Sequence, residues 1–196
     1  EPLGALDKNL REQMQYEIKH IHERIGITVV YVTHDQSEAL TMSNRIGVFN
    51  DGVIKQLSTP DVLYEKPENS FVAQFIGENN KLTGTVKSVN GQYCEVDLDG
   101  GGTTKALKIN VDSAGQKTQL SVRPERVSVG TAASENIFTG KVEELIYLGD
   151  HIRVRLNVCG NNEFIVKISN EGNISFKEGD NVDLSWLADD IRALDL

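Results

Sequence analysis

The chain has 196 residues, of which 39% are hydrophobic and 25% charged, and its formal net charge is −9. This length supports one or two domains with hydrophobic cores, and no apolar run approaches the roughly 20 residues needed to span a bilayer. No basic-then-apolar leader opens the sequence, so we expect any membrane association to come through a partner. The acidity argues against binding to the phosphate backbone of nucleic acid. Cys94 and Cys159 lack CxxC spacing, which fits a reducing cytosol and offers no metal site.

The stretch between Asp7 and Gly26 is expected to form a helix. Asp7 is a suitable N-cap, and Gly26 is a suitable residue to end the helix. Apolar residues recur along it at helical spacing, which predicts one buried stripe. This expected core stripe consists of Leu10, Met14, Ile18, Ile21 and Ile25.

The run ITVVYV at 27–32 is β-branched and lacks polar alternation. Such a run is typical of a strand covered on both faces, as in a parallel sheet. Its neighbours in such a sheet are not found in these residues, and an exposed apolar strand edge favours pairing with another chain. We therefore expect residues 1–77 to be partly disordered, or to associate or swap between copies.

Helix, hairpin and helix signals follow in turn. The stretch 36–43 has helical character, and Asn50-Asp51-Gly52 can form the tight turn of a hairpin. Pro60 is placed to begin a helix, and another short helix is expected to end at Gly77.

From Lys81 onward, short alternating segments are separated by turn residues every 8–12 positions, which predicts an all-β barrel or sandwich. The segments 82–98 and 138–156 resemble each other and carry Thr-Gly pairs at 83–84 and 139–140. This internal similarity favours a barrel made of related units. The single tryptophan, Trp186, is expected in the core rather than in a stacking platform.

His34 and Asp35 stand where the apolar run meets the next expected helix. One interpretation is that Asp35 simply caps that helix. The other is that His34 faces a ligand, because ligands of open α/β sheets bind beyond the carboxyl ends of the strands. Spacing alone leaves both open.

Two segments carry a resemblance to a known family. EPLGALD at 1–7 and VTHDQSEA at 32–39 resemble the nucleotide-binding subunits of ABC transporters, in which a glutamate at a strand end, a D-loop aspartate and a switch histidine follow in this order. The tail STPDVLYEKPENSFVAQFIGENN resembles the importer class, and the remainder with SVRPERV resembles its OB-like (TOBE) regulatory extension. The spermidine/putrescine branch is most similar, although ferric-iron, phosphonate and sugar importers share most of these motifs.

The resemblance implies an α/β plus all-β fold class. Residues 1–78 would be the C-terminal portion of a P-loop-type ABC ATPase domain, and residues 79–196 an OB-like β-barrel (TOBE) domain. Glu1 would act as the general base on the attacking water, His34 would bind the γ-phosphate, and Asp7 would link two subunits of a homodimer. The implied cofactors are ATP and Mg²⁺. The implied partners are membrane permease subunits and, indirectly, a solute-binding protein, with the protein peripheral on the cytoplasmic face of the membrane.

Several family motifs are not found in this sequence. They are the G-x-x-x-x-G-K-[ST] phosphate loop, the LSGGQ-type signature and the magnesium-binding aspartate before Glu1. DGGGTT at 99–104 fits a hairpin loop. The sequence also opens without methionine, so we expect a piece of a longer ATPase that does not hydrolyse ATP by itself.

Other classes of function are less well supported. The β half is interpreted as regulatory or dimerising, with a small-ligand module as the alternative. A hydrolase built on His34 and Asp35 lacks a G-x-S-x-G nucleophile. A pure scaffold would leave the D-loop and histidine motifs without an explanation.

Overall fold

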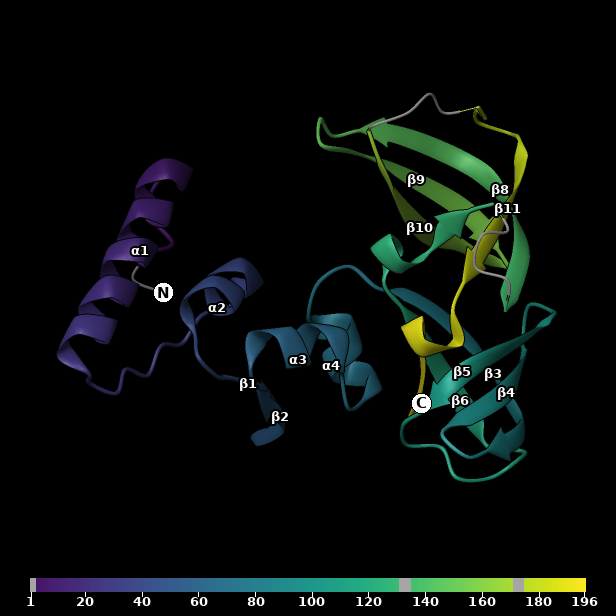
Figure 1. Cartoon of the computed structure of the whole chain (residues 1–196), viewed down its shortest axis with the longest axis horizontal. Helices are drawn as coiled ribbons and strands as arrows, with labels where there is room; N and C mark the ends of the chain where they lie inside the picture. Colours follow the sequence, from purple (N-terminus) through teal and green to yellow (C-terminus); the bar gives the residue numbers. More distant parts are fainter. Residues whose placement is uncertain (1–2, 131–134, 171–174) are drawn as a thin grey trace. The chain divides into compact units, whose positions relative to one another are not determined.

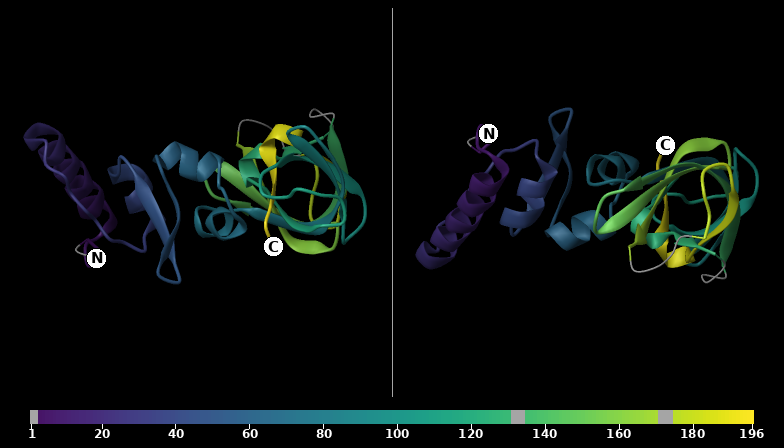
Figure 2. Two further views of the ribbon diagram at one scale, coloured as in Figure 1. Left: turned by 90° about the horizontal axis from the view of Figure 1, so that it is seen from below. Right: turned by 90° about the horizontal axis from the view of Figure 1, so that it is seen from above.

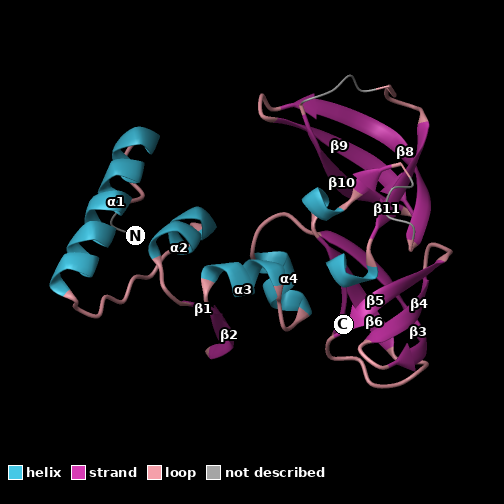
Figure 3. Ribbon diagram, in the orientation of Figure 1, coloured by secondary structure: helices cyan, strands magenta, loops and turns pink. Residues whose placement is uncertain are grey.

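The computed structural model describes residues 3–130, 135–170 and 175–196, and its contacts divide the chain into two units. The first unit runs to Pro67 and includes Phe75–Gly77, whereas the second comprises Glu68–Gln74 and Glu78–Leu196. Helices dominate the first unit and strands the second, as the colouring in Figure 3 shows. None of the described helices combines the length and the apolar composition required to cross a membrane.

The N-terminal elements are labelled in Figure 1. They are α1 (Lys8–Ile25), α2 (Gln36–Met42), β1 (Ile46–Asn50), β2 (Val53–Ser58), α3 (Pro60–Glu65) and α4 (Ser70–Phe75). Local chemistry sets their ends as predicted. The Asp7 carboxylate accepts the Leu10 N–H at 3.0 Å, and Gly26 ends α1 in the left-handed conformation. Asp51 and Gly52, with φ of 50° and 76°, form the turn between β1 and β2.

The prediction that the apolar stripe of α1 is buried in a core is wrong for this chain. Leu10 is 41% exposed, Ile21 42% and Ile25 57%. Gln15 is the buried residue of α1, and Lys19 Nζ donates to the Thr41 carbonyl of α2 at 3.5 Å. Most of the apolar stripe is exposed and only Ile18 is half-buried, because no element of the described residues covers the stripe as a core would.

The predicted strand at 27–32 is also wrong for this chain. These residues have no regular secondary structure, and Val30 and Val32 are 87% and 75% exposed. An isolated β-branched run cannot satisfy its backbone groups as a strand without neighbours. Among the described residues no strand pairs with it. The expected association or exchange between copies stays a prediction.

The second unit contains two sets of strands whose order repeats. The first set is β3 (Asn80–Asn90), β4 (Tyr93–Leu98), β5 (Thr103–Lys108) and β6 (Lys117–Val122). The second set is β8 (Asn136–Tyr147), β9 (His151–Val158), β10 (Asn161–Ser169) and β11 (Asn181–Trp186). The order β5-β4-β3-β6 in one sheet matches β10-β9-β8-β11 in the other. The similar sequence segments at 82–98 and 138–156 fall on corresponding strands, β3–β4 and β8–β9.

A fifth strand from each set pairs with the other set. After β6, the short 3-10 helix η1 (Pro124–Arg126) leads to β7 (Ser128–Val129), which pairs with β11. After β11, η2 (Ala188–Asp190) leads to β12 (Ile191–Leu194), which pairs antiparallel with β6 and parallel with β5. This last strand closes the five-stranded barrel β12-β5-β4-β3-β6, and Figure 2 shows the strands of this unit from below and above. The predicted barrel is confirmed, with two sets of strands that each complete the other.

Two buried asparagines, one in each set of strands, hydrogen-bond to the backbone of a strand in the other set. At the start of β3, Asn80 Nδ2 donates to the Ile165 carbonyl, and Asn80 Oδ1 accepts the Ile165 N–H, both at 2.7 Å. At the start of β8, Asn136 does the same for Lys105, at 3.1 and 2.8 Å. Ile165 lies in β10 and Lys105 in β5, so each asparagine satisfies the backbone of a strand in the opposite set.

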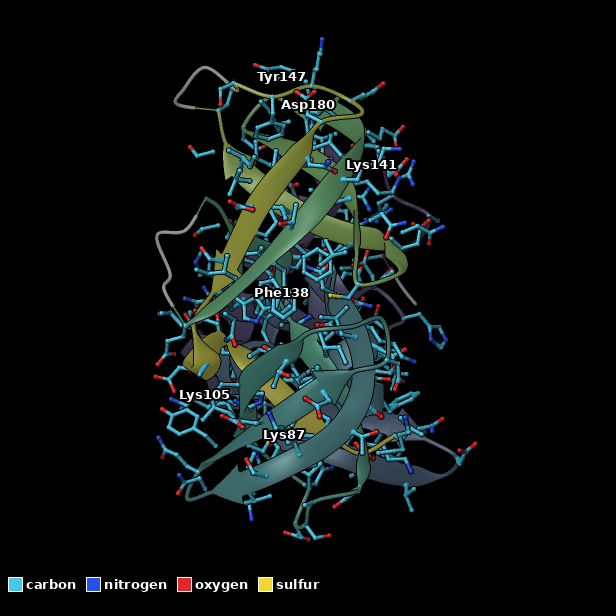
Figure 4. All side chains as sticks on the ribbon, turned by 90° about the vertical axis from the view of Figure 1, so that its right-hand side faces the viewer. Lys87, Lys105, Phe138, Lys141, Tyr147 and Asp180 are labelled. Atoms are coloured by element: carbon cyan, nitrogen blue, oxygen red, sulfur yellow. The ribbon has the colours of Figure 1, made fainter. Side chains whose placement is uncertain are left out.

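Trp186 lies in the core of the second unit, as predicted, with no exposed surface. Its ring stacks on Phe138 with centroids 4.8 Å apart, and it also contacts Phe164. Its indole N–H donates to Thr104 Oγ1 at 3.4 Å. Phe138 is labelled among these interior side chains in Figure 4, whereas Tyr147 and Lys105 lie at the periphery.

Candidate functional site: the His34 turn

The turn at Thr33–Asp35 connects the irregular segment to α2. Asp35 is the N-cap of α2, because its Oδ1 accepts the Ser37 N–H at 2.8 Å and the Glu38 N–H at 3.3 Å. The side chain of His34 is exposed. The capping interpretation is therefore correct for Asp35, whereas the role of the neighbouring His34 toward a ligand stays a prediction.

A buried carboxylate supports this turn from behind. Glu38 is only 3% exposed, and its Oε2 accepts Tyr31 Oη–H at 2.9 Å and Thr33 Oγ1–H at 2.8 Å. Thr33 Oγ1 also accepts the Asp35 N–H at 2.9 Å. These bonds fix the backbone on both sides of His34, so the imidazole is presented from a turn with a defined conformation.

Arg11 connects the Asp7 segment to the His34 turn. Its guanidinium donates through Nη2 to the Leu6 carbonyl at 3.0 Å, and its Nη1 lies 3.6 Å from the Asp35 carboxylate. Its Nε atom is buried without a hydrogen-bond partner in the described structure. Since Leu6 directly precedes Asp7, the arginine brings the two predicted site segments together.

The predicted site residues are placed as follows. Asp7 caps α1 and His34 stands in the turn before α2, in segments joined through Arg11. Glu1 lies outside the described residues. Sequence reasoning missed Arg11 and Glu38, which have the appearance of ordinary helix residues. The partner of Arg11, Asp35, lies 24 positions away, and Tyr31, a partner of Glu38, lies 7 positions away, outside the helix. The catalytic roles of Glu1, Asp7 and His34 stay predictions.

These residues do not form a complete site for a nucleotide and its metal ion. No group of three or more histidine, cysteine, aspartate or glutamate side chains that could hold a metal is found in the part of the chain that the structure describes. His34 can offer one N–H donor to a phosphate oxygen.

A second candidate site lies in the strand-rich unit. A cavity of about 330 Å³ is lined by residues of β3, by the end of β4 and the loop after it, and by the loop between β9 and β10 with the start of β10. These residues are Lys81, Leu82, Thr83, Leu98, Asp99, Gly100, Cys159, Gly160 and Asn161. Asp99 is already engaged by Lys117 Nζ at 2.8 Å. The hydrogen bond from Lys117 and that from Thr83 lower the pKa of the Asp99 carboxyl. The carboxylate in the cavity lining is therefore already paired with a lysine, and no aromatic side chain lines the cavity.

Comparison with known proteins agrees with the sequence resemblance. Residues 120–194 match the TOBE domain family. The chain is 41% identical over 189 residues to the spermidine/putrescine import ATP-binding protein PotA of Rubrobacter xylanophilus, covering 95% of this chain and 50% of that protein. It is 42% identical to the PotA proteins of Pseudomonas aeruginosa UCBPP-PA14 and Thermobifida fusca, covering 96% and 95% of this chain and 54% and 50% of theirs.

A solved structure supports the fold of the second unit. It is the cytoplasmic molybdate-binding protein ModG in a molybdate-bound form, with a TM-score of 0.52 and 22% identity, covering 60% of this chain and 96% of ModG. At this identity the likeness shows the fold alone. The chain spans about half the length of the curated relatives that it matches. It is thus a relative, along nearly its whole length, of spermidine/putrescine import ATP-binding proteins, and it carries a TOBE domain at residues 120–194.

Proposed function

We propose that this chain is part of the ATP-hydrolysing subunit of an ABC import system, and that the imported solute is a polyamine. The observation that carries the proposal is the 41–42% identity to proteins named spermidine/putrescine import ATP-binding protein. The accessible His34, held in a turn that is tied to the Asp7 segment, supports it. Importers of ferric iron, phosphonate or sugars are the alternative within the same class.

In this proposal the nucleotide-facing roles follow the family resemblance. His34 would donate a hydrogen bond to the γ-phosphate of ATP, and Glu1 would orient and deprotonate the attacking water. Asp7 would contact a second copy of the subunit. Bound ATP and Mg²⁺ would supply the reacting phosphate and the charge that stabilises it, while residues 1–78 contribute to the ATPase domain and 79–196 form the regulatory one.

The proposed partners follow from the same assignment. Permease subunits would hold the protein on the inner face of the membrane, and a solute-binding protein would act through them. The strand-rich unit would regulate or join the two ATPase subunits. The 330 Å³ cavity favours a second candidate role for this unit, the binding of a small ligand, which a titration of polyamine, molybdate or sugar phosphate, followed by Trp186 fluorescence, would test.

Phosphate release tests the main proposal. In a protein that joins this chain to the part present in its longer relatives, we expect His34→Ala to lower ATP hydrolysis by about 10²-fold or more, because it removes a hydrogen-bond donor to the phosphate on which charge develops. His20→Ala, on the exposed side of α1, is the matched control and should leave the rate unchanged. The 196-residue chain alone should release no phosphate. Steady release by this chain, abolished by His34→Ala, would overturn the assignment.

A further inference from the structure

Three hydrogen bonds form a closed circuit around position 34. The Glu38 N–H donates to Asp35 Oδ1 at 3.3 Å, and the Asp35 N–H donates to Thr33 Oγ1 at 2.9 Å. Thr33 Oγ1–H donates in turn to Glu38 Oε2 at 2.8 Å. All of these residues belong to the first unit. His34 lies in the sequence between two members of the circuit, Thr33 and Asp35.

Glu38 departs from the usual role of a glutamate at the third position of a helix. Because Asp35 is the N-cap of α2, Glu38 stands where a capping box places an acidic side chain that accepts the N-cap N–H directly. In this chain the Asp35 N–H goes to Thr33, and the Glu38 carboxylate accepts the Thr33 and Tyr31 hydroxyls instead. Glu38 is only 3% exposed, and burying a carboxylate costs free energy of desolvation. Capping does not require this arrangement, since Asp35 already caps α2.

The circuit restrains the backbone at His34. The Asp35 N–H belongs to the peptide group that joins His34 to Asp35, so its bond to Thr33 restrains the ψ angle of His34. The rotamers open to a side chain depend on the φ and ψ angles of its own residue. Glu38 gives the Thr33 hydroxyl a direction, because the proton points to the carboxylate and a lone pair of Oγ1 stays available for the Asp35 N–H.

We propose that Glu38, acting through the Thr33 hydroxyl, is a positioning residue for the His34 imidazole. Without the carboxylate the Thr33 hydroxyl can rotate, the peptide group before Asp35 is released, and the imidazole samples several rotamers. The use of this positioning in ATP hydrolysis rests on the proposed function, in which His34 donates to the γ-phosphate, because a donor stabilises developing charge best when it is held in place beforehand. The positioning itself does not depend on that function.

NMR of the 196-residue chain tests the positioning without any activity assay. Thr33→Val removes the hydroxyl and keeps the branched shape of the side chain, so the Asp35 N–H loses its acceptor. We expect amide hydrogen exchange at Asp35 to become at least about tenfold faster. The three-bond couplings that report χ1 of His34 should change from those of one dominant rotamer to an average over several. Glu38→Ala should have the same two effects, and Thr33→Val decides the question if Glu38→Ala does not fold.

Two control variants separate the circuit from general effects on the turn. Thr33→Ser keeps the hydroxyl, so exchange at Asp35 should stay within about threefold of the unchanged chain, and the His34 couplings should be retained. Thr41→Val makes the same replacement within α2, where the Thr41 hydroxyl donates to the Ser37 carbonyl at 2.7 Å. Because that bond lies outside the circuit, neither readout should change.

The consequence for ATP hydrolysis is measured in the protein that joins this chain to the part present in its longer relatives. Thr33→Val should lower kcat about tenfold and leave KM for ATP within about twofold, because the misplaced contact is one that strengthens in the transition state. Thr33→Ser should keep the original kcat, and so should Thr41→Val. A loss of kcat in His34→Ala that Thr33→Val does not share would exclude a use of the positioning in hydrolysis.

Unchanged His34 couplings in Thr33→Val would refute the positioning role, and so would a change of equal size in Thr41→Val. A change in Glu38→Ala that Thr33→Val does not reproduce would show that Glu38 only stabilises the fold of the turn, and would refute the role as well. Failure of the proposed function is a separate result. In that case His34→Ala leaves kcat unchanged, while the His34 couplings still respond to Thr33→Val and support the positioning.

Discussion

Asn80 offers a sharp test of how the two strand sets hold each other. Asn80→Ala removes both hydrogen bonds to Ile165 and leaves a backbone N–H and a C=O without partners in β10, where Ile165 is 7% exposed. Each unsatisfied buried group costs about 1–3 kcal/mol, so we expect the free energy of unfolding to fall by about 2–5 kcal/mol. Urea unfolding followed by the fluorescence of Trp186, the single tryptophan, measures it.

Two further variants separate hydrogen bonding from packing. Asn90→Ala, at the exposed far end of β3, should change the free energy of unfolding by less than about 0.5 kcal/mol. Asn80→Asp keeps the shape of the side chain but places a charge beside the Ile165 carbonyl and removes the donor, so it should cost at least as much as alanine. If Asn80→Ala matched Asn90→Ala, or Asn80→Asp were nearly neutral, the backbone-satisfaction argument would be refuted.

Further expectations concern close packing and titration. Gly100→Ala would place a Cβ 1.6 Å from the Cys159 carbonyl oxygen and should lower the free energy of unfolding by at least about 2 kcal/mol. In the control Gly47→Ala the nearest atom lies at 3.6 Å, so the thermal unfolding midpoint should stay close to that of the unchanged chain. Burial raises the pKa of the Cys94 thiol from 9.0 to about 11, so a thiol reagent should label the partly exposed Cys159 first and Cys94 only on unfolding. The stability from the raised pKa of Cys94 is full below pH 9 and lost as pH rises through about 11. Burial opposes ionisation of Glu78, but its cationic neighbours outweigh it and lower the pKa of this carboxyl from 4.5. Its stabilisation is thus present above that value and lost as pH falls through the lower folded pKa, and unfolding titrations of Glu78→Gln should lack this acid-side loss.

Local sequence signals predicted the elements whose cause is local. The N-cap at Asp7, the end of α1 at Gly26 and the Asp51-Gly52 turn all depend on the conformational preferences of one or two residues. The alternating segments likewise gave the strands of the second unit, because one buried face produces a period of two. The strand β12 escaped prediction, since four residues after a 3-10 helix carry too little pattern.

Predictions that depend on distant partners failed or were incomplete. The run at 27–32 and the stripe of α1 have the composition of buried structure, but burial requires covering elements that the described residues do not provide. The same limit applies to the site. His34 and Asp35 could be located from their motif, whereas the contacts of Arg11 with Asp35 and of Gln36 with Gly77 join residues 24 and 41 positions apart.

The TOBE match at 120–194 covers less of the chain than the barrel requires. The last strand in that segment, β12, closes a barrel whose β3, β4 and β5 precede residue 120. Asn80 and Asn136 satisfy backbone groups in opposite strand sets. Each set alone would therefore expose a strand edge and leave buried polar groups without partners, both of which are costly. The two sets consequently stabilise each other only when both are folded, and residues 80–194 are expected to unfold in one cooperative step.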